Sequence, residues 1–347
     1  MSEPRRQSTM ADVAELAGVS VPTVSRVLSG AANVSQKRRD KVMAAIAELN
    51  FRPSAAARVL ASRKSEVVSI VAGDTSKYGY AETIRGIEEA ARAHGYTVMI
   101  TVVETTDGPE IDSALASTMS QPLAGVIVLK FDPPGVAALK RIPGDIPVVA
   151  LSGIRETGVH QAVIDETRAG EELTRYLLEQ GHRTVHHVRV PPSRREDGRT
   201  TGWRRALRKA EREIPPPLDA SWDPQSGRRI GHALAEDPGV TAVFCGNDEI
   251  AMGVIRGIAD RGLRVPEDIS VAGFDNHPLS SLWNPELTTA NQDFAGLGGR
   301  GFQLLVSQLR GEAGPRFSSD RPEIIVRAST AAPNAARGSV AERDEAV

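Results

Sequence analysis

The chain has 347 residues, of which 40% are hydrophobic, and this is enough to bury more than one core. Its one cysteine, Cys245, excludes an internal disulfide framework and a cysteine metal site. The sequence shows no signal-peptide pattern and no run of about 20 apolar residues, so we expect a cytoplasmic protein that crosses no membrane. The net charge is only −2, but residues 1–65 hold eleven Lys and Arg against five Asp and Glu, and such a basic segment on an acidic body is typical of DNA-binding proteins.

Residues 9–29 predict two short helices joined by a turn. Thr9 with Asp12 three residues later is a capping-box start for the first helix, and Gly18 ends it. Ser20 can then cap the second helix, whose first turn tolerates Pro22 because its N–H groups have no intrahelical partner. The apolar spacing predicts a buried face made of Val13, Leu16, Ala17, Val24, Val27 and Leu28.

The second helix of this pair would turn small side chains and one arginine outward: Val21, Pro22, Thr23, Ser25 and Arg26. A short helix of this kind fits the major groove of DNA, where arginine can donate two hydrogen bonds to a guanine edge. An ordinary helical hairpin on the protein surface is the alternative interpretation.

A third helix is predicted after Ser35, its expected N-cap, with a buried face of Val42, Ala45, Ile46 and Leu49. Four cations, Lys37, Arg38, Arg39 and Lys41, lie near its start, where the helix dipole disfavours positive charge. This conflict indicates contact with DNA phosphates, or else a solvated basic face.

Four sequence words in this region resemble the LacI/GalR family of transcription regulators: Asp12-Val-Ala-x-Leu-Ala-Gly-Val-Ser20, Thr23-Val-Ser-Arg-Val-Leu28, Asn33-Val-Ser35 and Arg52-Pro-Ser-x-x-Ala-Arg-x-Leu60. Similarity of this kind runs from about Thr9 to Thr330. The resemblance implies that residues 54–62 form a hinge helix, ordered when two protomers sit on operator DNA, with Leu60 wedged into the minor groove. The predicted DNA contacts are Thr9, Ser20, Val21, Pro22, Thr23, Ser25, Arg26, Asn33, Arg58 and Leu60.

From Val67 onward, apolar runs alternate with amphipathic stretches. We predict strands at 67–72, 97–103, 125–129, 147–151, 185–190, 241–245 and 270–274, and helices at 81–94, 166–180, 203–212, 225–236 and 248–262. This alternation predicts doubly wound parallel sheets, and some 270 residues of it are too many for one such sheet. The fold class expected is therefore a small all-α helix-turn-helix headpiece on an α/β core of two lobes, which resembles the periplasmic-binding-protein-like core of the family.

The predicted domain organisation has four parts. Residues 1–53 form the headpiece, 54–65 the hinge helix and linker, 66–330 the effector-binding and dimerisation core, and 331–347 a flexible tail. By resemblance, the chain of the core crosses between its lobes near residues 161, 291 and 320. The tail lacks a leucine heptad, which favours a dimer over a tetramer joined by a coiled coil.

Polar residues at strand ends indicate where a ligand binds, because ligands of such folds lie beyond the carboxyl ends of the strands. Asn247 and Asp275 each follow an apolar run, and Arg199 lies near the start of a helix. A carboxylate, an amide and a guanidinium together suit the hydroxyl groups of a sugar. Asn247 and Asp248 can also be read as a helix cap.

The resemblance implies that Arg199, Asn247 and Asp275 bind the effector, with Gln292 close to the pocket. Trp222 falls where some sugar-binding members place a tryptophan against the ring, and its alternative is a place in the core. The loop from Gly73 to Tyr80 is expected to form the opposite wall, with Asp74, Tyr78 and Tyr80 as candidates. Ser152 stands where many sugar-responsive members carry an aspartate, so the site has one carboxylate acceptor fewer there.

Two further patterns are interpreted as structural. Gly296-Leu-Gly298-Gly-Arg-Gly301 matches the dinucleotide-binding fingerprint in letters, but it lacks the strand before it and continues as an amphipathic helix. Neighbouring strand residues face opposite sides, so His186 and His187 cannot easily bind one metal ion. We expect no cofactor and no metal.

The sequence therefore predicts a repressor that binds a palindromic operator as a homodimer and is released by a small carbohydrate. A solute-binding protein of the same core fold, or an enzyme, is the alternative class.

Overall fold

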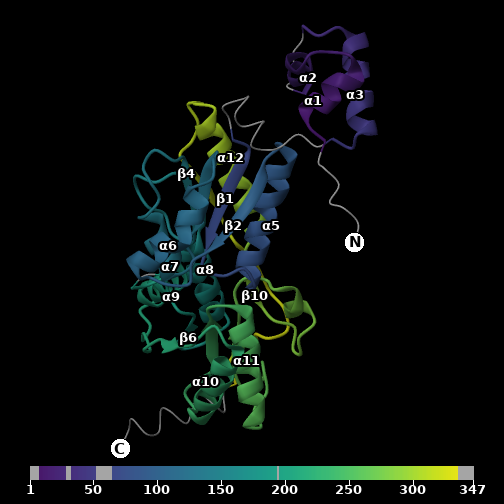
Figure 1. The fold of residues 1–347 in the computed structure, drawn as a ribbon. Helices are drawn as coiled ribbons and strands as arrows, with labels where there is room; N and C mark the ends of the chain where they lie inside the picture. The colour runs from purple at the N-terminus through teal and green to yellow at the C-terminus, as the bar shows by residue number, and fades with distance from the viewer. Residues whose placement is uncertain (1–7, 29–32, 52–64, 194, 335–347) are drawn as a thin grey trace, which may run out of the picture. The chain divides into compact units, whose positions relative to one another are not determined.

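The computed structural model describes residues 8–28, 33–51, 65–193 and 195–334, and the chain divides into two compact units, Met1–Glu66 and Val67–Val347 (Figure 1). The predicted hinge helix, with Arg58 and Leu60, lies outside the described residues. Within the described parts of the chain, each helix is too short or too polar to cross a bilayer.

The described residues of the first unit form three helices, α1 (Met10–Ala17), α2 (Val21–Leu28) and α3 (Gln36–Glu48). The predicted capping box is present, because the Thr9 hydroxyl accepts from the Asp12 N–H while the Asp12 carboxylate accepts from the Thr9 N–H. Gly18 ends α1 with a φ of 63°, a left-handed conformation that glycine adopts without strain.

The core of this unit confirms most of the predicted buried face, with Leu28, Ile46 and Leu49 partly buried and one correction at Leu16. Val13, Ala17, Val24, Val27, Val42 and Ala45 are buried, together with Phe51. Leu16 is instead 46% exposed, because the buried stripe follows positions 10, 13, 14 and 17, and Leu16 lies outside that i, i+3, i+4, i+7 spacing. Ser35 occupies the N-cap position of α3, but its side chain makes no capping hydrogen bond.

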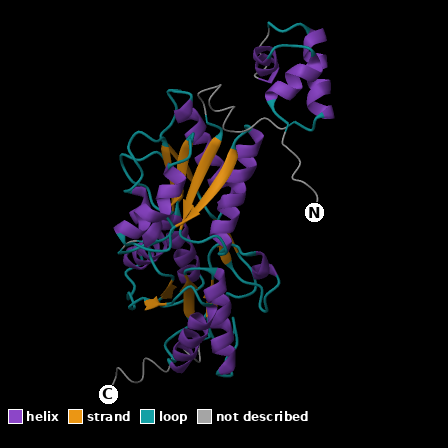
Figure 2. Ribbon diagram, viewed as in Figure 1, coloured by secondary structure: helices purple, strands orange, loops and turns teal. Residues whose placement is uncertain are grey.

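The first lobe of the second unit is built on a six-stranded parallel sheet with the order β11-β5-β4-β3-β1-β2. The strands are β1 (Val67–Ala72), β2 (Thr97–Val102), β3 (Gly125–Leu129), β4 (Val148–Ser152), β5 (Gln161–Ile164) and β11 (Phe317–Asp320). Helices α5 (Tyr78–Ala93) and α12 (Phe294–Leu309) cover one face, and α6 (Gly108–Met119) and α7 (Pro133–Leu139) cover the other. Figure 2 shows these strands between helices, which is the predicted doubly wound arrangement.

The second lobe repeats this design on a four-stranded parallel sheet with the order β7-β6-β8-β9. Its strands are β6 (His186–Arg189), β7 (Leu218–Asp219), β8 (Ala242–Cys245) and β9 (Ser270–Ala272). Helices α8 (Glu166–Glu179) and α9 (Gly198–Lys209) pack on one face, and α10 (Pro224–Glu236) and α11 (Asp248–Asp260) on the other, with a short 3-10 helix η1 (Pro278–Ser281) beyond β9.

The chain passes between the lobes three times, after β5, after β10 (Thr289–Asn291) and after β11. The last passage leads to β12 (Glu323–Ile325), which pairs antiparallel with β10. Residues 331–334, placed by the sequence in a flexible tail, belong to the second lobe instead. The Ala331 carbonyl lies 3.0 Å from Nε2 of His182 and accepts from the Ser270 hydroxyl at 3.0 Å.

Candidate functional site

Helix α2 presents the first candidate surface. Val24 and Val27 are buried against α1 and α3, which leaves Val21, Pro22 and Arg26 exposed and Thr23 and Ser25 partly exposed. The Ser20 hydroxyl lies 2.9 Å from the Thr23 hydroxyl, so these two predicted contacts form one polar pair at the start of the helix. This exposed face therefore carries small side chains, both apolar and polar, around one guanidinium.

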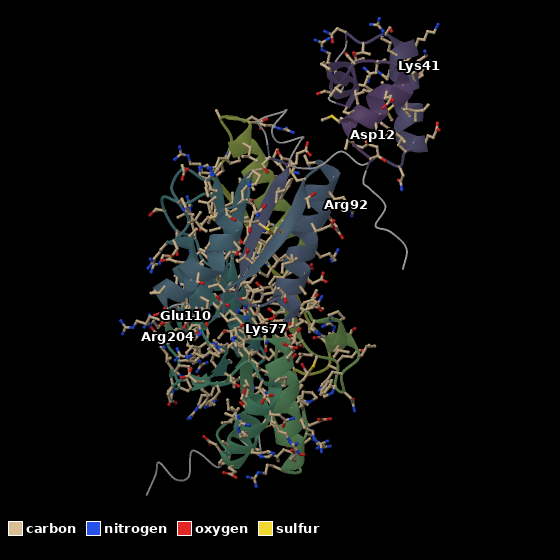
Figure 3. The ribbon with its side chains drawn as sticks, in the orientation of Figure 1. Asp12, Lys41, Lys77, Arg92, Glu110 and Arg204 are labelled. Atoms are coloured by element: carbon tan, nitrogen blue, oxygen red, sulfur yellow. The ribbon has the colours of Figure 1, made fainter. Side chains whose placement is uncertain are left out.

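The other predicted DNA contacts of the first unit flank this helix. Thr9 and Asn33 are exposed, and Thr9 also uses its hydroxyl in the capping box. Lys37, Arg38 and Lys41 are exposed on α3, and Figure 3 labels Lys41 on that helix. The described part of the first unit thus carries its cations on solvent-facing positions.

The second candidate site is a cleft in the second unit, lined by residues of both lobes and here called the interlobe cleft. Figure 3 labels Lys77, one of its lining residues, where the two lobes meet. Strand ends and helix starts supply the lining, as the parallel topology requires. Lys130 directly follows β3, Ser152 is the last residue of β4, Asn247 precedes α11, and Glu166 is the first residue of α8.

Aromatic side chains form much of the first-lobe wall. Tyr80 and Phe131 meet edge to face at 5.1 Å between ring centroids, Tyr78 and Phe294 at 5.9 Å, and Phe131 and Phe294 at 6.4 Å. The Tyr80 hydroxyl donates to Asp132 at 2.5 Å, and burial raises the pKa of this phenol, so it remains protonated. Trp222 faces them from the second lobe and packs partly against the core of that lobe.

A buried charge cluster forms the opposite part of the cleft. Nη2 of Arg199 donates to Oε1 of Glu166 at 2.8 Å and lies 3.8 Å from Oδ1 of Asp275, while Nη1 donates to the Gly246 carbonyl. Burial raises the pKa of Glu166 and Arg199 opposes that rise. Of the two carboxyl groups, Glu166 is the nearer to Arg199 and is the one that accepts its hydrogen bond.

Asp275 is held in a strained conformation beside this pair. Its φ of 114° lies in the region that non-glycine residues seldom adopt, and Nε2 of Gln292 donates to its Oδ1 at 2.6 Å. Burial raises the pKa of Asp275 to about 8, Arg199 opposes this, and Asp248 and Glu166 raise it further. At neutral pH this carboxyl group is therefore mostly protonated and can donate a hydrogen bond to a ligand.

Two lysines also line the interlobe cleft, and each lies beside a carboxylate. The buried Lys130 ammonium lies 2.6 Å from Oε2 of Glu156. The Lys77 ammonium lies 2.8 Å from Oδ2 of Asp74 and 4.8 Å from the centre of the Trp222 ring, so it covers one face of that ring.

The structure brings six of the eight predicted effector residues to the cleft: Tyr78, Ser152, Arg199, Trp222, Asn247 and Asp275. The remaining two, Asp74 and Gln292, are not lining residues. Asp74 accepts from the N–H and hydroxyl of Ser76 and pairs with Lys77, and Gln292 reaches the cleft only through Asp275.

Several lining residues were not predicted from the sequence: Lys130, Phe131, Glu156, Glu166, Asp197, Glu249 and Phe294. Lys77 was not singled out, although it lies in the loop predicted to form a wall of the site. The position of Lys130 after a predicted strand was an available signal. Glu166 follows β5, which is only four residues long and was not predicted as a strand. Asn247 also caps α11, accepting from the Ile250 N–H at 2.9 Å, whereas Asp248 is buried and holds His277, Ser280 and Thr289.

The two patterns interpreted as structural have packing roles. The glycine-rich segment lies inside α12, whose first turn is capped by Asp293 accepting from the Gly296 N–H. His187 is buried, with Nδ1 2.9 Å from the Phe244 carbonyl and Nε2 3.0 Å from the Thr200 hydroxyl, whereas His186 faces elsewhere. Among the described residues there is no group of three or more His, Cys, Asp or Glu arranged to hold a metal ion.

Comparison with known proteins gives two family matches. Residues 9–54 match the model described as "Bacterial regulatory proteins, lacI family", and residues 174–330 match "Periplasmic binding protein-like domain". Catabolite control protein A of Priestia megaterium is 33% identical over 312 residues, which cover 88% of this chain and 93% of that protein.

Solved structures agree over nearly the whole length. A crystal structure of the lac repressor dimer bound to operator and the anti-inducer ONPF has a TM-score of 0.86 and 28% identity, covering 94% of this chain and 100% of that one. A complex of the transcriptional regulator CelR with cellobiose has a TM-score of 0.69 and 27% identity, covering 93% and 100%.

Proposed function

Because this chain belongs to the LacI family of bacterial transcription regulators, we propose that it is a repressor that binds a near-palindromic operator as a dimer and is released by a small carbohydrate. In this proposal residues 1–53 bind DNA, and residues 54–65 form the hinge, with Arg58 in contact with DNA and Leu60 at the operator centre. Residues 66–330 bind the effector and pair the protomers. The family consists of regulators and not of enzymes, and a protein that acts on DNA in bacteria works in the cytoplasm.

The observation that carries the carbohydrate assignment is the lining of the interlobe cleft. Five of the fourteen aromatic residues of the chain lie there, and polar side chains with both donors and acceptors face them. Aromatic faces pack against the C–H faces of sugar rings, while carboxyl, amide and guanidinium groups bond the hydroxyls. The cellobiose complex of a relative supports the same class of ligand.

Two exposed apolar surfaces support the dimer. Ile100 and Val102 lie on β2, an edge strand of the six-stranded sheet, and Leu279 and Leu282 lie at η1 in the other lobe. Exposed apolar patches of this kind are typical of protein interfaces. The lac repressor relative was crystallised as a dimer on its operator.

The mechanism follows from linkage between the two sites. If the effector binds one arrangement of the lobes better, it shifts the population toward that arrangement and changes the separation of the two headpieces. The coupling is reciprocal, so a sugar that weakens operator binding must bind the operator complex more weakly by the same factor, about five- to 150-fold.

The test is fluorescence anisotropy on a DNA duplex from upstream of its own gene, repeated over a panel of mono- and oligosaccharides. We expect tight binding to this duplex, weak binding to a scrambled one, and release by one sugar. Binding that is equal on both duplexes and purely salt-sensitive would contradict the repressor assignment.

A further inference from the structure

Arg199 would ordinarily be the anion-binding group of the interlobe cleft, because a guanidinium binds carboxylates and phosphates with two parallel hydrogen bonds. Here both of its terminal nitrogens already face protein oxygens. Nη1 donates to the Gly246 carbonyl and Nη2 donates to Glu166. The guanidinium also lies 4.7 Å from the centre of the Phe274 ring, which covers one of its faces.

Glu166 is built into this position. It is the first residue of α8, directly after the N-cap Asp165, and its side chain is only 13% exposed. Two glycines leave the room that it occupies. A Cβ at Gly153 would lie 2.2 Å from Cδ of Glu166, and a Cβ at Gly198 would lie 2.9 Å from its Cβ. The Glu166 side chain therefore fits only because positions 153 and 198 carry no side chain of their own.

The other cations of the described cleft are likewise paired. Lys77 lies 2.8 Å from Asp74, and Lys130 lies 2.6 Å from Glu156. Oδ2 of Asp197, which also lines the cleft, is buried without a hydrogen-bond partner among the described residues. An anionic ligand would lose its hydration and meet carboxylates in return, which is unfavourable.

We propose that Glu166 determines the charge selectivity of the cleft: by occupying Arg199, it makes the site accept uncharged sugars and exclude sugar acids and sugar phosphates. This inference rests on the proposed function, because it names the class of effector that the same cleft takes. Glu166 influences ligand selectivity indirectly, by accepting the hydrogen bond that Arg199 would otherwise donate to an anionic ligand.

The test uses Glu166→Gln, which keeps the shape of the side chain and removes its charge. The matched control is Glu249→Gln, which removes a carboxylate of the same cleft that accepts from Nδ2 of Asn247 at 3.5 Å and not from Arg199. Calorimetry of the full chain with inorganic phosphate and with glucuronate should show affinity at least about tenfold higher for Glu166→Gln than for the wild type and the control. The double variant E166Q/R199M should lose the gain.

An equal gain in Glu249→Gln would overturn the proposal, because the effect would then come from the net charge of the cleft. So would a gain that survives in the double variant. If Glu166→Gln does not fold, Glu166→Asp, which withdraws the carboxylate by one methylene, should give a smaller gain of the same kind. A sugar phosphate that releases the wild-type protein from operator DNA would overturn it directly. Calorimetry needs no DNA, so a failure of operator binding would count against the proposed function alone.

Discussion

Asp275 combines a strained backbone with a buried carboxyl group, and both features matter for how it works. A positive φ at a non-glycine residue persists only where the surroundings impose it, and such positions gather at binding sites. Burial keeps the carboxyl group protonated at neutral pH, and Gln292 fixes its orientation. The side chain is thus a preformed hydrogen-bond donor beside the Arg199–Glu166 pair.

This protonation makes stability depend on pH. The pKa of Asp275 is raised by burial to about 8 in the folded state, so between about pH 4 and pH 8 the folded protein binds more protons than the unfolded chain. Stability therefore falls as the pH rises through this window. Asp275→Asn mimics the protonated acid and should remove the contribution of this carboxyl group to the pH dependence of the free energy of unfolding. That contribution is at most about 1.4 kcal/mol per pH unit.

Urea unfolding of the wild type and Asp275→Asn at several pH values between about 5 and 8 measures this difference. Parallel curves for the two proteins would mean that Asp275 is ionised throughout the window.

The helices and strands that were predicted correctly are those that the local sequence determines. The Thr9–Asp12 capping box and the apolar run of β1 each carry their own signal, and both were predicted correctly. The sequences of β5, Gln-Ala-Val-Ile, and β11, Phe-Ser-Ser-Asp, carry little strand signal. These segments are strands because β5 pairs with β4 and β11 pairs with β5, and this pairing forms only in the folded lobe.

The site divides in the same way. Asn247 and Asp275 were predictable because each follows an apolar strand within a few residues, a position that the sequence pattern shows. Glu166 and Glu156 were not, because their partners Arg199 and Lys130 lie far away in the sequence and meet them only in the folded lobes. Pairings of this kind depend on tertiary packing, which one sequence does not display.

The first prediction for an element concerns α1. Thr9→Ala removes the hydroxyl that accepts from the Asp12 N–H, and loss of such a cap costs about 1 kcal/mol of helix stability. Hydrogen exchange of the α1 amides should become correspondingly faster, roughly fivefold. Thr9→Ser keeps the hydroxyl and serves as the control; unchanged protection in Thr9→Ala would show that the cap contributes nothing.

The second concerns the exposed face of α2. Arg26→Ala should weaken operator binding by about 1–3 kcal/mol and relax the preference at one base position, as expected for a direct contact to a base. Lys41→Ala on α3 should weaken all duplexes equally and lower the salt dependence, as expected for a phosphate contact. Anisotropy on a set of single-base operator variants separates the two, and uniform weakening by Arg26→Ala would remove it from base recognition.

For the molecule as a whole, the apolar surface at η1 predicts how two chains pair. Leu282 is 79% exposed, so Leu282→Asp should leave the fold intact while it places a charge in the proposed interface. Sedimentation should show a monomer, and operator affinity should fall toward that of a single half-site. Ala210→Asp, on an exposed position at the end of α9, is the control; a dimeric Leu282→Asp would place the interface elsewhere.

The three passages between the lobes also bear on how the protein is made. A chain leaving the ribosome completes the headpiece core once Phe51 has emerged, whereas the first lobe still lacks α12 and β11, which follow residue 293. Until then the apolar sheet face that includes Ile70, Ile127 and Leu151 lacks its cover from α12. Biosynthesis therefore completes the helix-turn-helix part early and the proposed effector-binding core only near the end. A chain stopped before α12 would carry the DNA-binding helices without a complete core to regulate them.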